Sequence, residues 1–136
     1  MTYALSGALQ AAVYDLLQSD PGLTAMIGDA VYDAVPGGSL PETYVLLGQE
    51  MAKDASDPEG AGADHRLTLS VITSAPGLST AKGCAALICD LLHGAQPTLS
   101  RGHVVDMAFL KATARRIDGA AGRQIDLQFR ARVADA

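Results

Sequence analysis

Apolar residues recur at helical spacing in two segments, 5–17 and 81–92. Both segments have the one-sided stripe of an amphipathic helix that packs against a core. Between them, Asp20 is a favoured N-cap, Pro21 is a favoured first helical residue, and Gly28 follows as a stop signal. The pattern therefore predicts two main helices with a helix of one or two turns after the first.

Strand patterns fill most of the remaining chain. A short extended run covers residues 31–34, a β-rich run covers 43–49, and alternating apolar and polar residues cover 65–73. The last third predicts a long hairpin with arms at 104–117 and 123–133. The second arm alternates without a break, so we expect one of its faces to meet a core and the other to be polar.

The first arm of this hairpin changes phase. Its apolar positions follow one alternation over residues 105–109 and the opposite alternation over 110–114. Because successive side chains of a strand point to opposite faces, such a change needs one extra residue. We therefore predict a β-bulge near Leu110.

The segment Glu50–Asp64 has no apolar periodicity and holds five acidic residues against Lys53. We expect it to be a long loop between strands, either functional or disordered, because structureless loops of this length are uncommon in compact domains. The spacing of Asp54, Asp57 and Glu59 does not fit a calcium loop. A solvated, flexible loop is the better interpretation than a metal site.

These elements predict an α+β fold. We expect a mainly antiparallel sheet, two main helices packed on one of its faces, and the long loop between strands. The 136 residues show no repeats and fit one domain, 1–136, with about two-thirds of the unfolded surface buried on folding.

Charge is divided between the two halves of the chain. Residues 1–64 hold ten acids and one base, a net charge of −9, whereas residues 65–136 hold nine bases and five acids, a net charge of +4. A domain with one acidic and one basic part can attract a copy of itself head to tail, and such contacts close into rings or extend into filaments. The alternative is that the halves fold against each other and neutralise locally.

The chain offers little that is typical of an enzyme. It has no phosphate-binding glycine loop, nucleophile elbow or paired zinc histidines, and we expect no catalytic, cofactor-binding or metal-binding residue. His65, His93 and His103 lack ligand spacing and are expected at strand edges or helix ends. Cys84 and Cys89 lie too far apart around the predicted helix for a disulfide, and we expect both to be free thiols.

No apolar run approaches the ~18 residues of a membrane span, and no basic residue precedes the first apolar run as in a secretory signal. We therefore expect no membrane association and an origin in the cytoplasm. The sequence pI of about 4.9 argues against specific nucleic-acid binding. Arginines alternate with Gln and Asp on the last hairpin, a pattern that suits a protein partner; the alternative is a solvated sheet face.

These charged segments are the candidate binding surfaces of the chain. Asp and Glu of the expected loop and Arg of the last hairpin have opposite signs, so they could meet between copies. The residues that we assign to an interface with another subunit or another protein are Glu50, Asp54, Asp57, Glu59, Asp64, Arg115, Arg116, Arg130 and Arg132.

Four segments carry a resemblance to a known family: ALSGALQAAVYDLL, AVYDAVPGGSLPETYVLLG, HRLTLSVITSAPGLSTAKGCAALICDLLHG and RGHVVDMAFLKATARRIDGAAGRQIDLQFRARV. Together they resemble the tail terminator, or tail-completion, family of long-tailed phages, and most of all its version in bacterial gene transfer agents. The resemblance implies a structural, non-enzymatic subunit without cofactor. By the same resemblance, the subunit would form a hexameric ring on the head-proximal end of a tail tube.

The resemblance also implies partners and a location. The ring would end tube growth and join the tail to a head connector or stopper protein, and DNA would pass through its channel without specific binding. The subunit would reside in the bacterial cytoplasm during assembly and then in the tail or neck of a phage-like particle. We expect the segment Glu50–Asp64 to lie at a protein interface and to become ordered on assembly; the alternative is that it lines the channel.

Two other functions stay open. A head-completion or stopper protein of the neck would share ring assembly but bind the portal side. A small α+β ligand-binding domain or enzyme is also compatible with the fold, because fold does not fix function.

Overall fold

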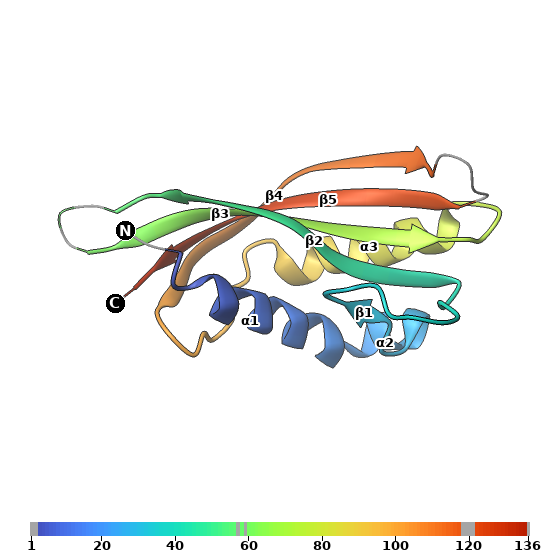
Figure 1. Cartoon of the computed structure of the whole chain (residues 1–136), viewed down its shortest axis with the longest axis horizontal. Coiled ribbons are helices and arrows are strands. Elements are labelled where there is room, and N and C mark those ends of the chain that lie inside the picture. Colours follow the sequence, from blue (N-terminus) through green and yellow to red (C-terminus); the bar gives the residue numbers. More distant parts are fainter. Residues whose placement is uncertain (1–2, 57, 59, 118–121, 136) are drawn as a thin grey trace.

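A computed structural model describes residues 3–56, 58, 60–117 and 122–135. The chain forms one five-stranded sheet in the order β1-β2-β3-β5-β4, and its helices lie on one face of that sheet (Figure 1). The elements are α1 (Ser6–Ser19), α2 (Pro21–Ile27), β1 (Val31–Tyr32), β2 (Thr43–Asp54), β3 (Gly62–Thr73), α3 (Ser79–Leu92), β4 (His103–Arg116) and β5 (Arg123–Ala134).

The sheet is antiparallel except at one edge. β2 pairs with β3, β3 with β5, and β5 with β4 in antiparallel registers, whereas β1 runs parallel to β2. The predicted α+β class, with a mainly antiparallel sheet and two main helices on one face, is confirmed.

The predicted start of the short helix is also confirmed. The backbone N–H of Leu23 donates to Asp20 Oδ2 at 2.8 Å, which satisfies one of the free N–H groups at the start of α2. The helix ends at Gly28, whose φ of 64° lies in the left-handed region that glycine adopts without a Cβ clash.

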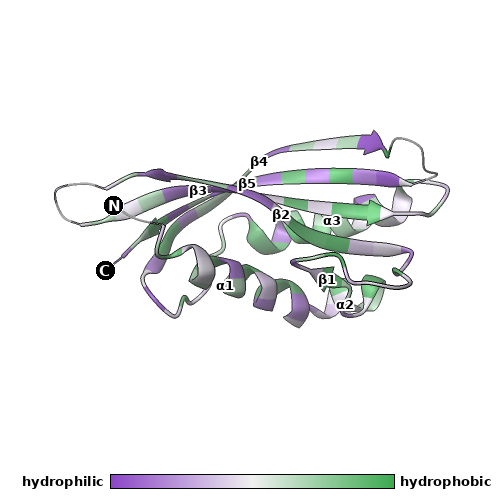
Figure 2. Ribbon diagram, viewed as in Figure 1, coloured by the Kyte–Doolittle hydropathy of each residue, from purple (hydrophilic) through white to green (hydrophobic). Residues whose placement is uncertain are grey.

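The core lies between the helices and the inner face of the sheet. β5 alternates as predicted, with the side chains of Ile125, Leu127, Phe129, Ala131 and Val133 buried, and Figure 2 shows the alternation of apolar and polar residues along this strand. The apolar stripes of α1 and α3 cover this face with Leu9, Leu17, Ile88 and Leu92, which are fully buried. Each such burial stabilises the fold by about 1.5–3 kcal/mol relative to exposure.

The bulge predicted near Leu110 is present. The register of β4 on β5 shifts between Phe109 and Lys111, so Leu110 has no partner. A comparable shift in β2 lies between Leu47 and Glu50, where Gly48 and Gln49 stand opposite the single residue Thr68 of β3. A Cβ at position 48 would lie 3.1 Å from the carbonyl oxygen of Thr68, so glycine suits this close approach.

The prediction of a long loop over Glu50–Asp64 is wrong. β2 continues to Asp54 and β3 begins at Gly62, so both ends of this segment are paired strand residues. The β2–β3 hairpin extends beyond the N-terminal end of α1 (Figure 1). Exposed residues such as Lys53 and Asp54 explain much of the polar composition, whereas Ala63 and His65 of the paired strand are buried.

Candidate subunit interface

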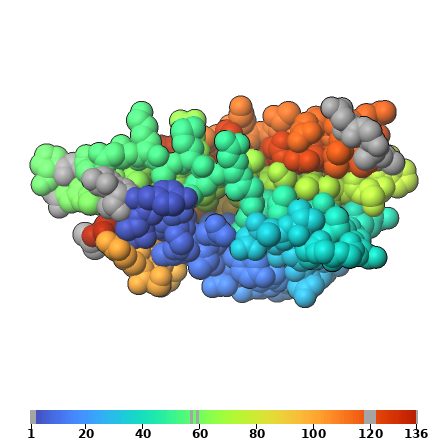
Figure 3. Space-filling model, in the orientation of Figure 1, coloured from blue at the N-terminus to red at the C-terminus, as the bar shows by residue number. Residues whose placement is uncertain are grey.

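The sheet order places the first and last parts of the chain at opposite edges, although the two charged halves still meet where Asp64 pairs with Arg130. The N-terminal elements lie at the β1 edge and the β4–β5 hairpin lies at the other edge, with β2 and β3 between them (Figure 3). We call Asp15, Asp20, Asp29, Asp33 and Glu42 the acidic edge, because they lie on α1, α2, β1 and their connections and no Lys or Arg precedes Lys53. The basic edge is Lys111, Arg115 and Arg116, all exposed on β4.

The two edges do not neutralise each other within the subunit. Ion pairs among the described residues join Glu50 to His65, Asp64 to Arg130, Asp126 to Arg115 and Asp135 to Arg101. None of these pairs joins the acidic edge to the basic edge. The free subunit therefore carries unlike charges on opposite edges of its sheet.

Exposed apolar side chains accompany both charged edges. Met26, Val35 and Leu40 are 39%, 53% and 41% exposed and lie among the acidic residues. Val105, Phe109 and Leu110 are 45%, 37% and 39% exposed and lie on β4. Apolar side chains surrounded by charged residues are typical of a protein–protein interface.

The outer edge of β4 is covered along its first half. The N–H of Gly94 donates to the carbonyl of Met107 at 2.6 Å, the N–H of Phe109 donates to His93 Nδ1 at 3.1 Å, and Gln96 Nε2 donates to the carbonyl of Val105 at 3.0 Å. Beyond Phe109 no comparable cover exists in the described part of the chain. An open strand edge can pair with another chain.

The arginines at the end of β4 differ in their partners. Arg115 Nε lies 3.5 Å from Asp126 Oδ2. Burial would raise the pKa of Asp126, but hydrogen bonds from Ser70 and Gln124 and the charge of Arg115 hold that pKa below its usual value. Arg116 lies opposite Arg123 in the register and makes no ion pair within the described residues. Like charges directly opposite each other in a sheet are unfavourable, so this pair would gain from an acidic partner.

Arg130 and Arg132 have contacts inside the subunit. Arg130 Nη2 lies 3.3 Å from Asp64 Oδ1, and Arg132 Nη2 donates to the carbonyl of Ala55 at 2.9 Å. Both contacts hold the β2–β3 hairpin on β5. A place for these arginines in an interface stays a prediction.

Glu50 belongs to a polar cluster on the inner face of the sheet. Ser6 Oγ donates to Glu50 Oε1 at 2.8 Å, His65 Nδ1 lies 2.8 Å from Glu50 Oε2, and the Tyr3 hydroxyl also donates to Glu50. The Tyr3 ring stacks on His65, with the ring centroids 6.1 Å apart. Glu50 therefore joins the start of α1 to the β2–β3 hairpin instead of projecting from a loop.

The structure tests the predicted positions of two histidines and of one acidic residue near this cluster. His65 is fully buried within β3, so its expected place at a strand edge is wrong, whereas His93 does follow the end of α3. Asp54 lies at the end of β2, where Ser56 Oγ donates to its Oδ1 at 2.7 Å. The predicted interface residues Asp57 and Glu59 lie outside the described residues.

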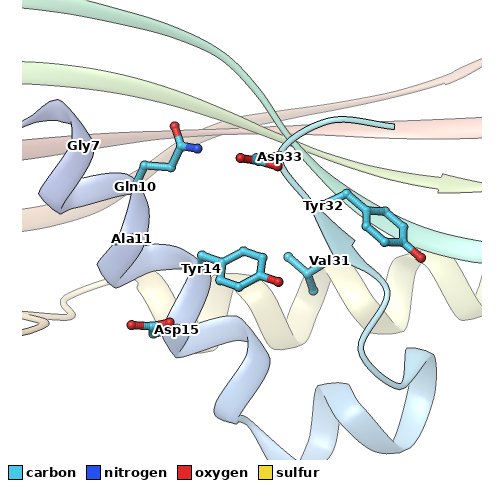
Figure 4. A pocket seen from close by; sticks show the side chains of 8 residues that line it. All are labelled: Gly7, Gln10, Ala11, Tyr14, Asp15, Val31, Tyr32 and Asp33. Atoms are coloured by element: carbon cyan, nitrogen blue, oxygen red, sulfur yellow. The ribbon is translucent and has the colours of Figure 1, made fainter. Parts of the chain in front are cut away.

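A groove of about 510 Å³ lies on the acidic edge, between α1 and β1. In Figure 4 the Gln10 amide and the Asp33 carboxylate lie at one end of it, and the Tyr14 ring extends from α1 toward Val31. Tyr32 and Asp15 complete the polar lining. The sequence did not single out these residues, because α1 and β1 are brought together by the fold and not by spacing along the chain.

The described residues contain neither a cluster of metal-binding side chains nor a helix that could span a membrane. There, no group of three or more His, Cys, Asp or Glu side chains is placed to hold a metal ion. No helix of that part of the chain combines the length and hydropathy needed to cross a membrane. Cys84 and Cys89 are free, and burial raises the pKa of both thiols.

Comparisons with known proteins agree on one family. Residues 11–134 match the model of the family described as tail completion protein gp17. A chain in a solved structure described as "Virion of native gene transfer agent (GTA) particle" is 56% identical, with a TM-score of 0.93 over 98% of this chain and 99% of that chain. No curated protein matched. The chain belongs to the tail completion protein gp17 family, and its role is that of a structural protein of a phage-type tail.

Proposed function

We propose that the chain forms a closed ring on the head-proximal end of a tail tube, where it ends tube growth and provides the surface that the head connector binds. The observation that carries this proposal is the separation of an acidic and a basic edge on opposite sides of one sheet. Membership in a tail completion family and the similarity to a chain of a gene transfer agent virion support it.

The position of the two edges explains how a ring could form. An interface between unlike edges is heterologous, because each copy uses its basic edge toward one neighbour and its acidic edge toward the other. Such contacts close into a ring when a whole number of rotations between neighbouring copies adds up to 360°. We propose six copies, the number that the family resemblance implies.

The charge balance also suits passage of DNA. The chain has a net charge of −5. A wall rich in Lys and Arg would retain phosphates through counterion release and slow the passage of DNA. In the proposed ring the basic edges are covered by the acidic edges of neighbours, so the channel holds DNA without specific binding.

The proposed role needs no catalysis. The chain acts by binding copies of itself, the tail tube protein and a connector or stopper protein. Its assembly would take place in the bacterial cytoplasm, and the finished ring would stay in the tail or neck of the particle.

Deletion of the chain from a particle-producing strain tests the role. We expect tails of abnormal length or with unfinished upper ends, together with normal heads, as seen by negative-stain electron microscopy. Restoring the chain should restore tails of uniform length. Normal free tails beside leaking heads would instead indicate a head-completion or stopper protein, the second candidate function.

A further inference from the structure

We propose that the groove between α1 and β1 binds the guanidinium group of Arg116 from a neighbouring copy. This inference rests on the proposed ring and names one specific contact in it. It assigns a binding site to the acidic edge and the side chain that enters it from the basic edge.

The lining of the groove suits a guanidinium group. Asp15 and Asp33 supply carboxylates, which form the strongest hydrogen bonds that arginine makes. Tyr14 and Tyr32 supply ring faces, on which a guanidinium stacks with a gain of about 0.5–2 kcal/mol. Carboxylates and aromatic rings along one groove favour arginine over an anion or an apolar ligand; in Figure 4 Asp33 and Tyr14 point into the space between α1 and β1, whereas Asp15 and Tyr32 lie at its margins.

The lining is also held in place before any ligand binds. Gln18 Nε2 donates to the Tyr14 hydroxyl at 3.0 Å and to the carbonyl of Asp29 at 3.2 Å, so it fixes the Tyr14 ring against the α2–β1 connection. The Tyr32 ring packs on Tyr44, with the centroids 5.9 Å apart. Binding would therefore order few additional side chains, and this lowers its entropic cost.

Small residues keep the α1 side of the groove open. Gly7 and Ala11 lie four residues apart and share a helix face with Tyr14. A Cβ added at Gly7 would have no heavy atom within 4 Å. A large side chain at position 7 or 11 would fill this space, so the present residues leave room for an incoming one.

Arg116 is the side chain best placed to enter the groove. It is exposed at the end of β4, it has no ion pair within the described residues, and it lies opposite Arg123. Arg115 already has Asp126 as a partner. In Figure 1 the C-terminal end of β4 and β1 lie toward the same end of the long axis, on opposite edges of the sheet. Two copies placed side by side with parallel axes would bring them together.

A charge swap tests this contact. The variants Asp33→Arg, Arg116→Asp and the double variant are expressed in a strain that lacks the wild-type chain, and the copies bound to purified tails are counted. We expect each single variant to lose at least about tenfold in tail-bound chain. The double variant should recover most of the loss, because each copy then offers an acid at position 116 and a base at position 33.

Matched controls separate this contact from a general charge effect. Lys82→Asp and Asp90→Arg make the same charge changes on exposed positions of α3 and should leave tail-bound chain unchanged. Thermal unfolding of Asp33→Arg and of both controls should match the wild type, because these positions are exposed, whereas Arg116→Asp should unfold at the same or a slightly higher temperature, because an acid opposite Arg123 replaces a like-charge pair.

The remaining outcomes would overturn the inference in distinguishable ways. Tail-bound chain at the wild-type level in both single variants would show that the groove does not bind Arg116, while the ring would stand. Loss in Asp33→Arg alone, without rescue, would assign the groove to a cation of another tail protein. Absence of the wild-type chain from tails would contradict the proposed function itself.

Discussion

At the residue scale, the Glu50 carboxyl illustrates what sequence patterns miss. Its acidic neighbours suggested a solvated loop, but the β2 bulge turns Glu50 to the inner face, where Tyr3, Ser6 and His65 contact it. Burial would raise its pKa, but the hydrogen bonds from these side chains and the charge of His65 hold the pKa below its usual value. We therefore expect the Glu50 side chain to be ionised in the folded protein.

The lowered pKa of Glu50 predicts a dependence of stability on pH. A carboxyl with a lower pKa in the folded state stabilises the fold above its unfolded pKa of about 4.5, and this contribution is lost as the pH falls through the folded pKa. We expect Glu50→Gln to lower the free energy of unfolding at neutral pH by about 1–3 kcal/mol. The measurement is urea unfolding at several pH values.

The test compares how steeply the free energy of unfolding changes with pH in the wild type and in Glu50→Gln. The free energy of unfolding of the wild type should fall more steeply below pH 4.5 than that of Glu50→Gln. Asp29→Asn is a matched control, because Asp29 is exposed and its side chain has no ion pair within the described residues. Equal slopes for the wild type and Glu50→Gln would show that the Glu50 carboxyl does not contribute as proposed.

At the element scale, the patterns that face the core were the most predictable. Residues 123–133 and the α1 and α3 stripes follow from apolar periodicity, because each of these faces is buried against another element. The Leu110 bulge followed from the change of alternation alone, since β4 is exposed from Phe109 onward. The β2–β3 hairpin was predicted as a loop, because Lys53 and Asp54 at its end are exposed and the bulge at Gly48 and Gln49 breaks its alternation. The groove lining could not be predicted, because only the tertiary packing joins α1 to β1.

Gly102, in the turn before β4, is a position where an added side chain should destabilise the fold. Gly102 has φ of 69°, and a Cβ there would lie 2.5 Å from the carbonyl oxygen of Ala134 and 2.9 Å from Leu5 Cδ1. We expect Gly102→Ala to lower the free energy of unfolding by more than about 1 kcal/mol, because of the strained backbone and the clash with β5. Chemical denaturation of the purified chain provides the measurement.

A second glycine gives the control for this prediction. Gly37 lies in the connection before β2, its φ is not positive, and an added Cβ would have nothing within 4 Å. We expect Gly37→Ala to be neutral or to stabilise the fold by up to about 1 kcal/mol, because it reduces the entropy of the unfolded chain. Equal effects at positions 37 and 102 would contradict the role assigned to Gly102.

At the scale of the whole molecule, the charge division along the sequence becomes a division across the sheet. The sequence alone allowed two outcomes, neutralisation within the subunit or attraction between copies. The strand order β1-β2-β3-β5-β4 puts the first and last parts of the chain at opposite edges, so the acidic edge and the basic edge do not meet inside one copy, although Asp64 of the first half pairs with Arg130 of the second. The exposed apolar residues on both edges then give each edge the composition of an interface.

The individual interface residues were less predictable than the charge division. Of the residues assigned from the sequence, Arg115 and Arg116 lie on the basic edge, whereas Glu50, Arg130 and Arg132 make contacts within the subunit. The acidic edge comes from α1 and from the connections around α2 and β1, a continuous stretch in which the sequence pattern marked no interface. A count of charges could find the asymmetry but not the side chains that share one surface.

The most direct test of the central claim is a cryo-electron microscopy map of a particle that carries this chain. We predict a closed ring at the head-proximal end of the tail tube, in which the β4 edge of each copy contacts the α1–β1 edge of the next. A location elsewhere in the particle, or a ring in which the acidic and basic edges both face solvent, would contradict it.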